Sequence, residues 1–190
     1  MADRARVGIL LSGRGSNMQA LVAASREGNA RYDVVLVASD KPEAPGLAWA
    51  AEQGIATFAA SPKGRPKPEY EAEIDGAMRN AGVEVIALAG YMRLLSPAFV
   101  QRWAGRILNI HPSLLPKYKG LDTHARAIEA GDTVAGASVH LVTEALDDGP
   151  VIAQAEVPVE AGDTPDTLAA RVLTAEHRLY PQALDRFLSR

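Results

Sequence analysis

The sequence predicts an α/β protein with a Rossmann-like, mostly parallel sheet, helices on both faces and an antiparallel C-terminal hairpin. Short apolar runs alternate with segments of helical periodicity up to residue 111, which is typical of parallel βαβ units. The run at residues 34–37 (VVLV) is continuously apolar, as in strands covered on both faces. Near the C-terminus two strand-like runs are joined by the short turn at 145–150, which favours an antiparallel hairpin.

Length and composition limit the class of protein. The 190 residues are 47% hydrophobic and 23% charged, as in a soluble domain with a sizeable core. We expect one domain over residues 1–190, with a phosphate-binding half of about 1–105 and a catalytic half of about 106–190. The net charge of -3 provides no global field for nucleic acid or an anionic membrane.

Cysteine is absent, which excludes disulfides and thiolate metal sites and fits a cytoplasmic enzyme. The first residues (MADRAR) lead directly into a strand-like run, so we expect no signal peptide. No apolar stretch approaches membrane-spanning length.

A Gly-rich turn follows the first strand. Residues 7–11 predict a buried strand, residues 12–17 (SGRGSN) a turn, and residues 18–25 a helix. This order aims backbone N–H groups and a positive helix end at a phosphate. No Gly-Lys-Ser/Thr follows and Met18 occupies the third glycine position, so neither a P-loop nor a full dinucleotide fingerprint is present. The turn is either a monophosphate site or a tight turn capped by Ser16.

The second strand is predicted at 33–39, followed by a helix at 45–53 and a third strand at 55–59. Asp40 comes just after the second strand. It could hold a ribose, or it could be a loop residue.

A basic, proline-punctuated loop is predicted at 61–68 (SPKGRPKP). It either links elements only or brings Arg65 or Lys67 over a bound anion. A helix at about 69–81 and a fourth strand at 84–89 follow. Ligands in such sheets bind beyond the carboxyl ends of the strands.

The segment 90–95 (GYMRLL) connects this strand to a helix for which Ser96 is the expected N-cap and Pro97 the first residue. Its apolar residues are either simple core or the wall of a pocket for a flat heterocycle.

A fifth strand at 106–110 ends in a loop bounded by prolines. Asn109 and His111 point to the same side of this strand, because strand side chains alternate. Pro112 holds His111 in an extended conformation. The two side chains either form part of a site at the mouth of the sheet or merely cap the loop.

The C-terminal part predicts a helix at 123–130 and strands at 137–143 and 151–157. Asp147 and Asp148 lie in the turn between the strands, where aspartate is common for conformational reasons alone.

A final helix begins at Pro165, and Pro181 is expected to bend or interrupt it. Glu176 and His177 lie on this helix, where such residues are more often surface or cap residues than site residues.

The polar residues suggest a chemistry by elimination. None of His111, His124, His140 and His177 lies in a tight ligand pair, so we expect no metal site. The absence of a Gly-x-Ser-x-Gly elbow argues against a serine hydrolase. A histidine beside an asparagine and an acidic turn suits acyl transfer without a covalent nucleophile.

Residues 109–116 (NIHPSLLP), with SVH at 138–140 and LDDGP at 146–150, resemble the folate-dependent formyltransferases. The turn at 12–19 (SGRGSNMQ) resembles the branch of this family that acts on glycinamide ribonucleotide in purine biosynthesis. The likeness covers essentially the whole chain, including EHRLYP at 176–181.

The resemblance implies the formyltransferase fold and transfer of a formyl group from 10-formyltetrahydrofolate, a cosubstrate, to the amine of glycinamide ribonucleotide. Asn109, His111 and Asp147 match the catalytic residues of the family. The amine attacks the formyl carbon directly, and Asn109 and protonated His111 stabilise the oxyanion. The resemblance also implies that His111 assists proton transfer to the folate nitrogen, and that Asp147 orients His111 and favours its protonated form.

By the same resemblance Gly15, Ser16 and Asn17 hold the phosphoribosyl end of the substrate, and Glu176 lies near it. The residues implied in folate binding are Lys67, Met92, Arg93, Leu94, Leu95 and Asn109.

Two positions depart from the family pattern. Many relatives have arginine where the alignment places Lys67, so Arg65 is a competing assignment. Relatives commonly have a single aspartate where Asp147 and Asp148 are adjacent here. We choose Asp147 because it stands two residues before Gly149.

Two other functions stay open. One is a formyltransferase for another amine, such as an amino sugar nucleotide or methionyl-tRNA, although the tRNA enzyme has a further C-terminal domain and this chain ends at Arg190 without a basic extension. The other is a nucleotide-binding module without catalysis. We expect a monomer or weak homodimer that acts on small molecules and binds neither nucleic acid nor membrane.

Overall fold

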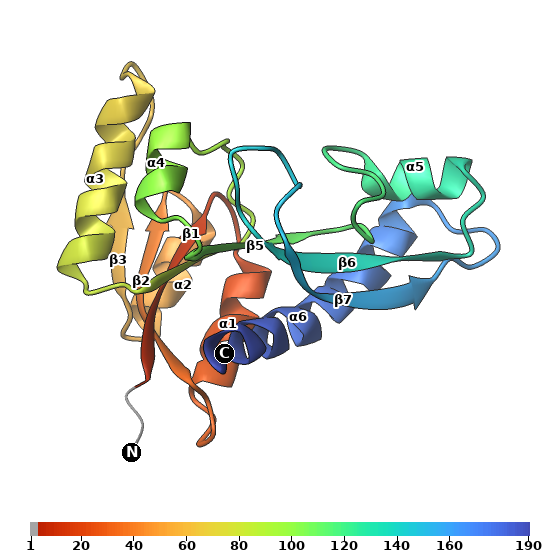
Figure 1. The fold of residues 1–190 in the computed structure, drawn as a ribbon, viewed down its shortest axis with the longest axis horizontal. Coiled ribbons are helices and arrows are strands. Elements are labelled where there is room, and N and C mark those ends of the chain that lie inside the picture. Colours follow the sequence, from red (N-terminus) through yellow and green to blue (C-terminus); the bar gives the residue numbers. More distant parts are fainter. Residues whose placement is uncertain (1–3) are drawn as a thin grey trace.

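The computed structural model describes residues 4–190 and contains one seven-stranded sheet (Figure 1). The strands are β1 (Ala5–Leu11), β2 (Tyr32–Ser39), β3 (Ala56–Ala59), β4 (Val85–Leu88), β5 (Ile107–His111), β6 (Val134–Leu141) and β7 (Val151–Pro158). Their order is β3-β2-β1-β4-β5-β6-β7. The first five strands along the chain run parallel, β6 is antiparallel to β5, and β7 is antiparallel to β6. The predicted mostly parallel sheet with an antiparallel C-terminal hairpin is confirmed.

Residues 1–3 lie outside the described residues. The expectations for the start of the domain and for the first residues of the chain therefore concern a part that the structure does not describe.

Helices cover both faces of the sheet. The helices are α1 (Ser16–Ser25), α2 (Pro45–Glu52), α3 (Lys67–Asn80), α4 (Pro97–Arg102), α5 (Thr123–Glu129) and α6 (Pro165–Leu188). On one face α1, α2 and α6 bury apolar side chains such as Leu21, Leu47 and Leu179. On the other face α3 and α4 bury Ile74 and Trp103, among others. Removing these side chains from water is the main favourable contribution to folding.

The long helix α6 runs beneath β5, β6 and β7 and also contacts α1 (Figure 1). It therefore connects the two halves of the sheet. Pro181 lies inside this helix, and the helix continues to Leu188. The predicted interruption of the helix at Pro181 is therefore wrong. A proline removes only one helical hydrogen-bond donor, and burial of Leu184 on the following turn keeps the helix against the sheet.

Several boundaries differ by one to three residues from the predictions, and two of them concern the loops around the candidate site. Helix α3 begins at Lys67, so the proline loop is shorter than the predicted range 61–68. Pro68 is compatible with this because a proline fits the first turn of a helix. Strand β6 begins at Val134, three residues earlier than expected. The cap at Ser96 is confirmed, since its hydroxyl accepts from the backbone N–H of Phe99.

The carboxyl edge of the sheet gathers three connections. Strands β2 and β4 flank β1 on opposite sides, so the chain order reverses at β1, the position where open α/β sheets bind ligands. The Gly-rich turn after β1 meets the segment after β4, because the Ser12 N–H donates to the Gly90 carbonyl over 3.1 Å. The loop after β5 is the third connection. Within residues 4–190, no helix has the length and hydropathy needed to cross a membrane.

Candidate active site

Asn109 and His111 end β5, and their neighbours on β6 complete a polar cluster. In the antiparallel register Asn109 lies opposite His140, and His111 lies opposite Ser138. The Ser138 hydroxyl donates to the carbonyl of Ser113 over 2.7 Å and accepts from the N–H of Leu115 over 3.0 Å. These contacts attach the proline loop to β6 beside the two candidate residues.

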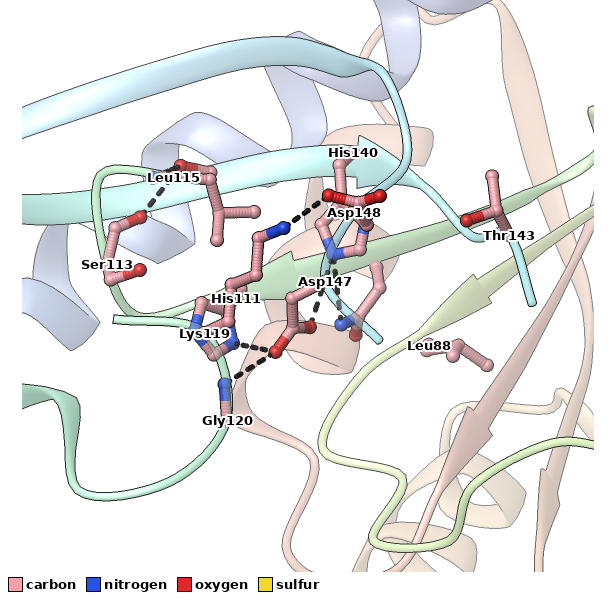
Figure 2. Close-up of polar contacts among 12 residues, drawn as sticks. Leu88, His111, Ser113, Leu115, Lys119, Gly120, His140, Thr143, Asp147 and Asp148 are labelled. Carbon is pink, nitrogen blue, oxygen red and sulfur yellow. Dashed lines mark hydrogen bonds and ion pairs between the residues drawn. The ribbon is translucent and has the colours of Figure 1, made fainter. Parts of the chain in front are cut away.

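Asp147 lies between the two histidines (Figure 2). Its Oδ2 is 3.4 Å from Nδ1 of His111, and its Oδ1 is 3.7 Å from Nε2 of His140. The same Oδ2 accepts from the backbone N–H of Gly120 over 2.9 Å. Asp147 is buried, whereas the adjacent Asp148 is exposed and pairs with Lys119. Only Asp147 contacts the histidine cluster.

The backbone explains how adjacent aspartates face different surroundings. Asp147 has a φ of 49°, in the left-handed region that aspartate tolerates better than most residues. The chain turns sharply there within the connection between β6 and β7. One carboxylate is therefore directed into the cluster and the next into solvent (Figure 2).

Both ring nitrogens of His111 face oxygen acceptors. Nδ1 faces Asp147 and Nε2 lies 2.8 Å from the carbonyl of Tyr118. The side chain is buried. An imidazolium donates from both nitrogens, so this surrounding accommodates the doubly protonated ring.

His140 fixes the amide of Asn109, a role that the sequence interpretation did not assign. Burial lowers the pKa of His140, so the ring is neutral at pH 7. Its Nδ1 lies 3.0 Å from the carbonyl of Leu141 and therefore carries the proton. Nε2 then accepts from Nδ2 of Asn109 over 3.4 Å. The alternation of the strand, which places residues 138 and 140 on one face, was the available signal.

Two cavities meet at this cluster. The first, the glycine-loop cavity, has a volume of about 570 Å³ and is lined by residues 13–17, Met92, His111 and Glu176, among others. The second, the hairpin cavity, has a volume of about 210 Å³; its lining includes residues 93–95 and 142–147, together with Asn109 and His140. His111 thus faces one cavity, and Asn109 and Asp147 face the other.

The glycine-loop cavity contains the first turn of α1. Gly15 has a φ of 72°, and a Cβ there would lie 2.8 Å from the side chain of Leu11, so the turn requires glycine. Ser16 is the first helical residue, and no side chain caps the helix. The interpretation of a turn capped by Ser16 is wrong. The first N–H groups of α1 therefore lack a side-chain cap, as an anion site at a helix N-terminus requires.

Glu176 is buried in the wall of the same cavity. Burial raises the pKa of its carboxyl group to about 7, and a hydrogen bond from Asn17 opposes this in part. Oδ1 of Asn17 is also buried and has no hydrogen-bond partner within residues 4–190. A buried amide oxygen without a partner is costly, and here it lies beside a cavity that a hydrogen-bonding ligand can enter.

The hairpin cavity is lined by apolar residues such as Leu88, Val100 and Val142 together with several polar ones. Arg93, Leu94 and Leu95 line it as expected, but Met92 lines the glycine-loop cavity instead. The segment therefore separates the two cavities.

Lys67 reaches this segment, since its Nζ donates to the carbonyl of Leu94 over 2.5 Å. Arg65 instead donates to the carbonyl of Ser61 and pairs with Glu73. Of the two basic residues considered, Lys67 is the one in contact with the wall of the hairpin cavity.

No group of three or more histidine, aspartate or glutamate side chains arranged for a metal ion occurs in the described part of the chain.

Comparisons with known proteins identify the family of the chain. The family model described as formyl transferase matches residues 5–184. The phosphoribosylglycinamide formyltransferase of Escherichia coli (strain K12) is 49% identical over 180 residues, which cover 94% of this chain and 85% of that protein. The crystal structure of phosphoribosylglycinamide formyltransferase from Brucella melitensis has a TM-score of 0.95 at 53% identity and covers 99% of this chain and 97% of its own.

The same likeness extends to a larger protein. The trifunctional purine biosynthetic protein adenosine-3 of Homo sapiens is 45% identical over 182 residues, 95% of this chain, but the match spans only 18% of that protein.

Proposed function

The chain belongs to the formyl transferase family, and we propose that it transfers a formyl group from 10-formyltetrahydrofolate to the amine of glycinamide ribonucleotide. The products are formylglycinamide ribonucleotide and tetrahydrofolate, in purine biosynthesis. The relatives named for this activity support the proposal. A single structural observation carries it: Asn109, His111 and Asp147 form one cluster at the boundary between two cavities.

The glycine-loop cavity suits the ribonucleotide. We propose that the N–H groups around Gly15, Ser16 and Asn17 bind its phosphate, because uncapped N–H groups at a helix N-terminus favour anions. Glu176 and the unpartnered amide oxygen of Asn17 can accept hydrogen bonds from the hydroxyl and amine groups of glycinamide ribonucleotide. The amine then lies toward His111.

The hairpin cavity suits a flat heterocycle, since its lining combines apolar and polar side chains. Its lining fits a folate-derived formyl donor. We propose that Arg93, Leu94, Leu95 and Asn109 contact the donor, that Lys67 supports the wall from behind, and that Met92 separates donor from acceptor.

The three catalytic residues then share one step. The amine nitrogen forms a bond to the formyl carbon while the formyl oxygen gains negative charge. The amide of Asn109 donates to that oxygen, and so does Nε2 of His111 once it exchanges the Tyr118 carbonyl for the substrate. The bond between the formyl carbon and the folate nitrogen breaks as that nitrogen receives a proton through His111, and the amine loses one. Asp147 holds His111 in orientation and balances its positive charge.

His140 supports this step without touching the substrate. Because its Nε2 accepts from Nδ2 of Asn109, the other N–H of that amide is left to donate to the substrate. His140 is therefore a positioning residue.

The two halves contribute differently in this proposal. Residues of about 1–105 bind the phosphate, and residues of about 106–190 supply the catalytic cluster. We also propose a cytoplasmic location, which the absence of cysteine supports. We propose a monomer or weak homodimer as well.

An assay of folate conversion tests the proposal. Purified protein is mixed with 10-formyltetrahydrofolate, and absorbance is followed with and without glycinamide ribonucleotide. Conversion that requires the ribonucleotide is the expected result. Conversion with an amino sugar nucleotide or methionyl-tRNA only, or with no acceptor tested, would contradict it.

A further inference from the structure

Asp40 is a buried carboxylate that the proposed reaction does not use. It follows β2, and its residue is only 3% exposed. A buried charge is costly unless it is paired and hydrogen-bonded. Asp40 is the loop residue considered from the sequence, since β2 ends at Ser39. It is buried and lines neither of the two cavities, which argues against the alternative of a ribose ligand.

Two partners satisfy this carboxylate. The Ser12 hydroxyl donates to Oδ1 over 2.6 Å, and the Arg93 guanidinium donates from Nε to Oδ2 over 3.1 Å. The Ser12 oxygen in turn accepts from the backbone N–H of Met92 over 2.9 Å. Asp40 thus holds two consecutive residues of the segment between the cavities. It contacts the side chain of Arg93 directly, and it holds the backbone N–H of Met92 through the Ser12 hydroxyl.

The two residues it holds face different ligands. Met92 lines the glycine-loop cavity and Arg93 lines the hairpin cavity. Ser12 is also the first residue of the Gly-rich turn. Helix α3 fixes the far end of the segment, where Glu71 accepts from the N–H of Ser96 over 2.9 Å. The segment after β4 is therefore held at one end by Asp40 and Ser12 and at the other end by Glu71.

We infer that Asp40 is a positioning residue that sets the wall between the two ligand cavities, and that its contact with Arg93 is required for tight binding of the folate. This inference rests on the proposed function. The contact with Ser12 maintains the Met92 side of the wall, so the two bonds of one carboxylate act on different ligands.

Asp40→Asn separates the two bonds. The amide oxygen can still accept from Ser12, but the amide nitrogen then faces the Nε donor of Arg93 and the contact is lost. We expect the Kd for tetrahydrofolate to rise about five- to tenfold, as for loss of a charged hydrogen bond partly screened by solvent. The KM for glycinamide ribonucleotide should change less than about twofold. Asp40→Ala removes both bonds and should weaken binding of both ligands.

The experiment measures tetrahydrofolate binding by titration calorimetry and steady-state kinetics for wild type and variants. Arg93→Gln tests whether Asp40 acts through Arg93, because Asp40→Asn should then have little further effect. Asp33→Asn is the matched control, since Asp33 lies on β2, the strand that precedes Asp40, and pairs with Arg4 at an exposed position. Thermal melts confirm that each variant is folded.

Each outcome decides a different point. A selective loss of folate affinity in Asp40→Asn, absent in the Arg93→Gln background, supports the inference. Unchanged folate affinity in a folded Asp40→Asn protein, or equal losses for both ligands, overturns it. A wild-type protein that binds tetrahydrofolate but transfers no formyl group overturns the proposed function. The tetrahydrofolate affinities of the Asp40 variants then still decide whether Asp40 positions the wall.

Discussion

Replacing Asp147 by asparagine removes one negative charge from the cluster while keeping the shape of the side chain. The Asp147 oxygen and Nδ1 of His111 are 3.4 Å apart, and both side chains are buried. Two unit charges at that distance attract by about 5 kcal/mol at an effective dielectric constant of about 20. The amide oxygen of asparagine can still accept from the Gly120 N–H and from His111, so part of the interaction remains.

We therefore expect the variant to lose part of this attraction in the transition state, which corresponds to a fall in kcat of roughly 10²–10³. The KM for glycinamide ribonucleotide should change little, because Asp147 does not line the glycine-loop cavity. The rate of folate conversion at saturating substrates measures kcat, and a ribonucleotide titration gives KM.

Asp148→Asn is the matched control. The same chemical change then occurs one residue further on, at an exposed carboxylate paired with Lys119. We expect near wild-type kinetics, because exposed ion pairs contribute little. Near wild-type turnover in Asp147→Asn, or equal damage in the two variants, would refute the reasoning.

Three further variants test other parts of the site. Glu176→Gln should raise Tm by roughly 5 °C at pH 8, because the Glu176 pKa of about 7 makes its ionisation above pH 7 destabilising. The gain in Tm should decline from pH 7 to 4.5 and vanish below pH 4.5. Thermal melts without this pH dependence would contradict the prediction. Lys67→Met should raise the folate KM about threefold or more by removing the hydrogen bond to Leu94, whereas Arg65→Met should not, and the reverse order would favour Arg65. Gly46→Ala places a Cβ 3.0 Å from the carbonyl oxygens of residues 13 and 14, so the KM for the ribonucleotide should rise roughly tenfold with folate binding unchanged. Wild-type kinetics in this variant would show that the backbone of the Gly-rich turn shifts without loss of binding.

The pH dependence of Glu176 has a definite sign. Its pKa is raised in the folded protein relative to the ordinary 4.5, so the folded state retains the proton over a range where the unfolded chain has lost it. Stability is therefore greatest below pH 4.5 with respect to this group and falls as pH rises to about 7. The shift corresponds to about 3 kcal/mol. A residue that lowers stability at neutral pH is consistent with a role in binding rather than in folding.

Much of the fold follows from local patterns in the chain. Continuous apolar runs predict buried parallel strands, and the Gly-rich turn between strand and helix predicts the phosphate side of the site, because both depend on residues close together in sequence. Asn109 and His111 share a strand, so alternation alone places their side chains on one side. The helix signals were less exact: Pro68 was assigned to a loop, and Pro181 was expected to bend or interrupt a helix that instead continues past it.

By itself, then, the sequence determined the sheet, the edge at which the candidate site lies and two residues of its polar cluster. The tertiary structure alone decided which aspartate contacts His111, which basic residue contacts the segment after β4, and that Asp40 is buried beneath it. These outcomes depend on the meeting of β2, β4, α3 and the β6–β7 connection, which lie far apart in the chain. No local pattern records such distances, because the φ of 49° at Asp147 and the burial of Asp40 are imposed by packing of the whole sheet.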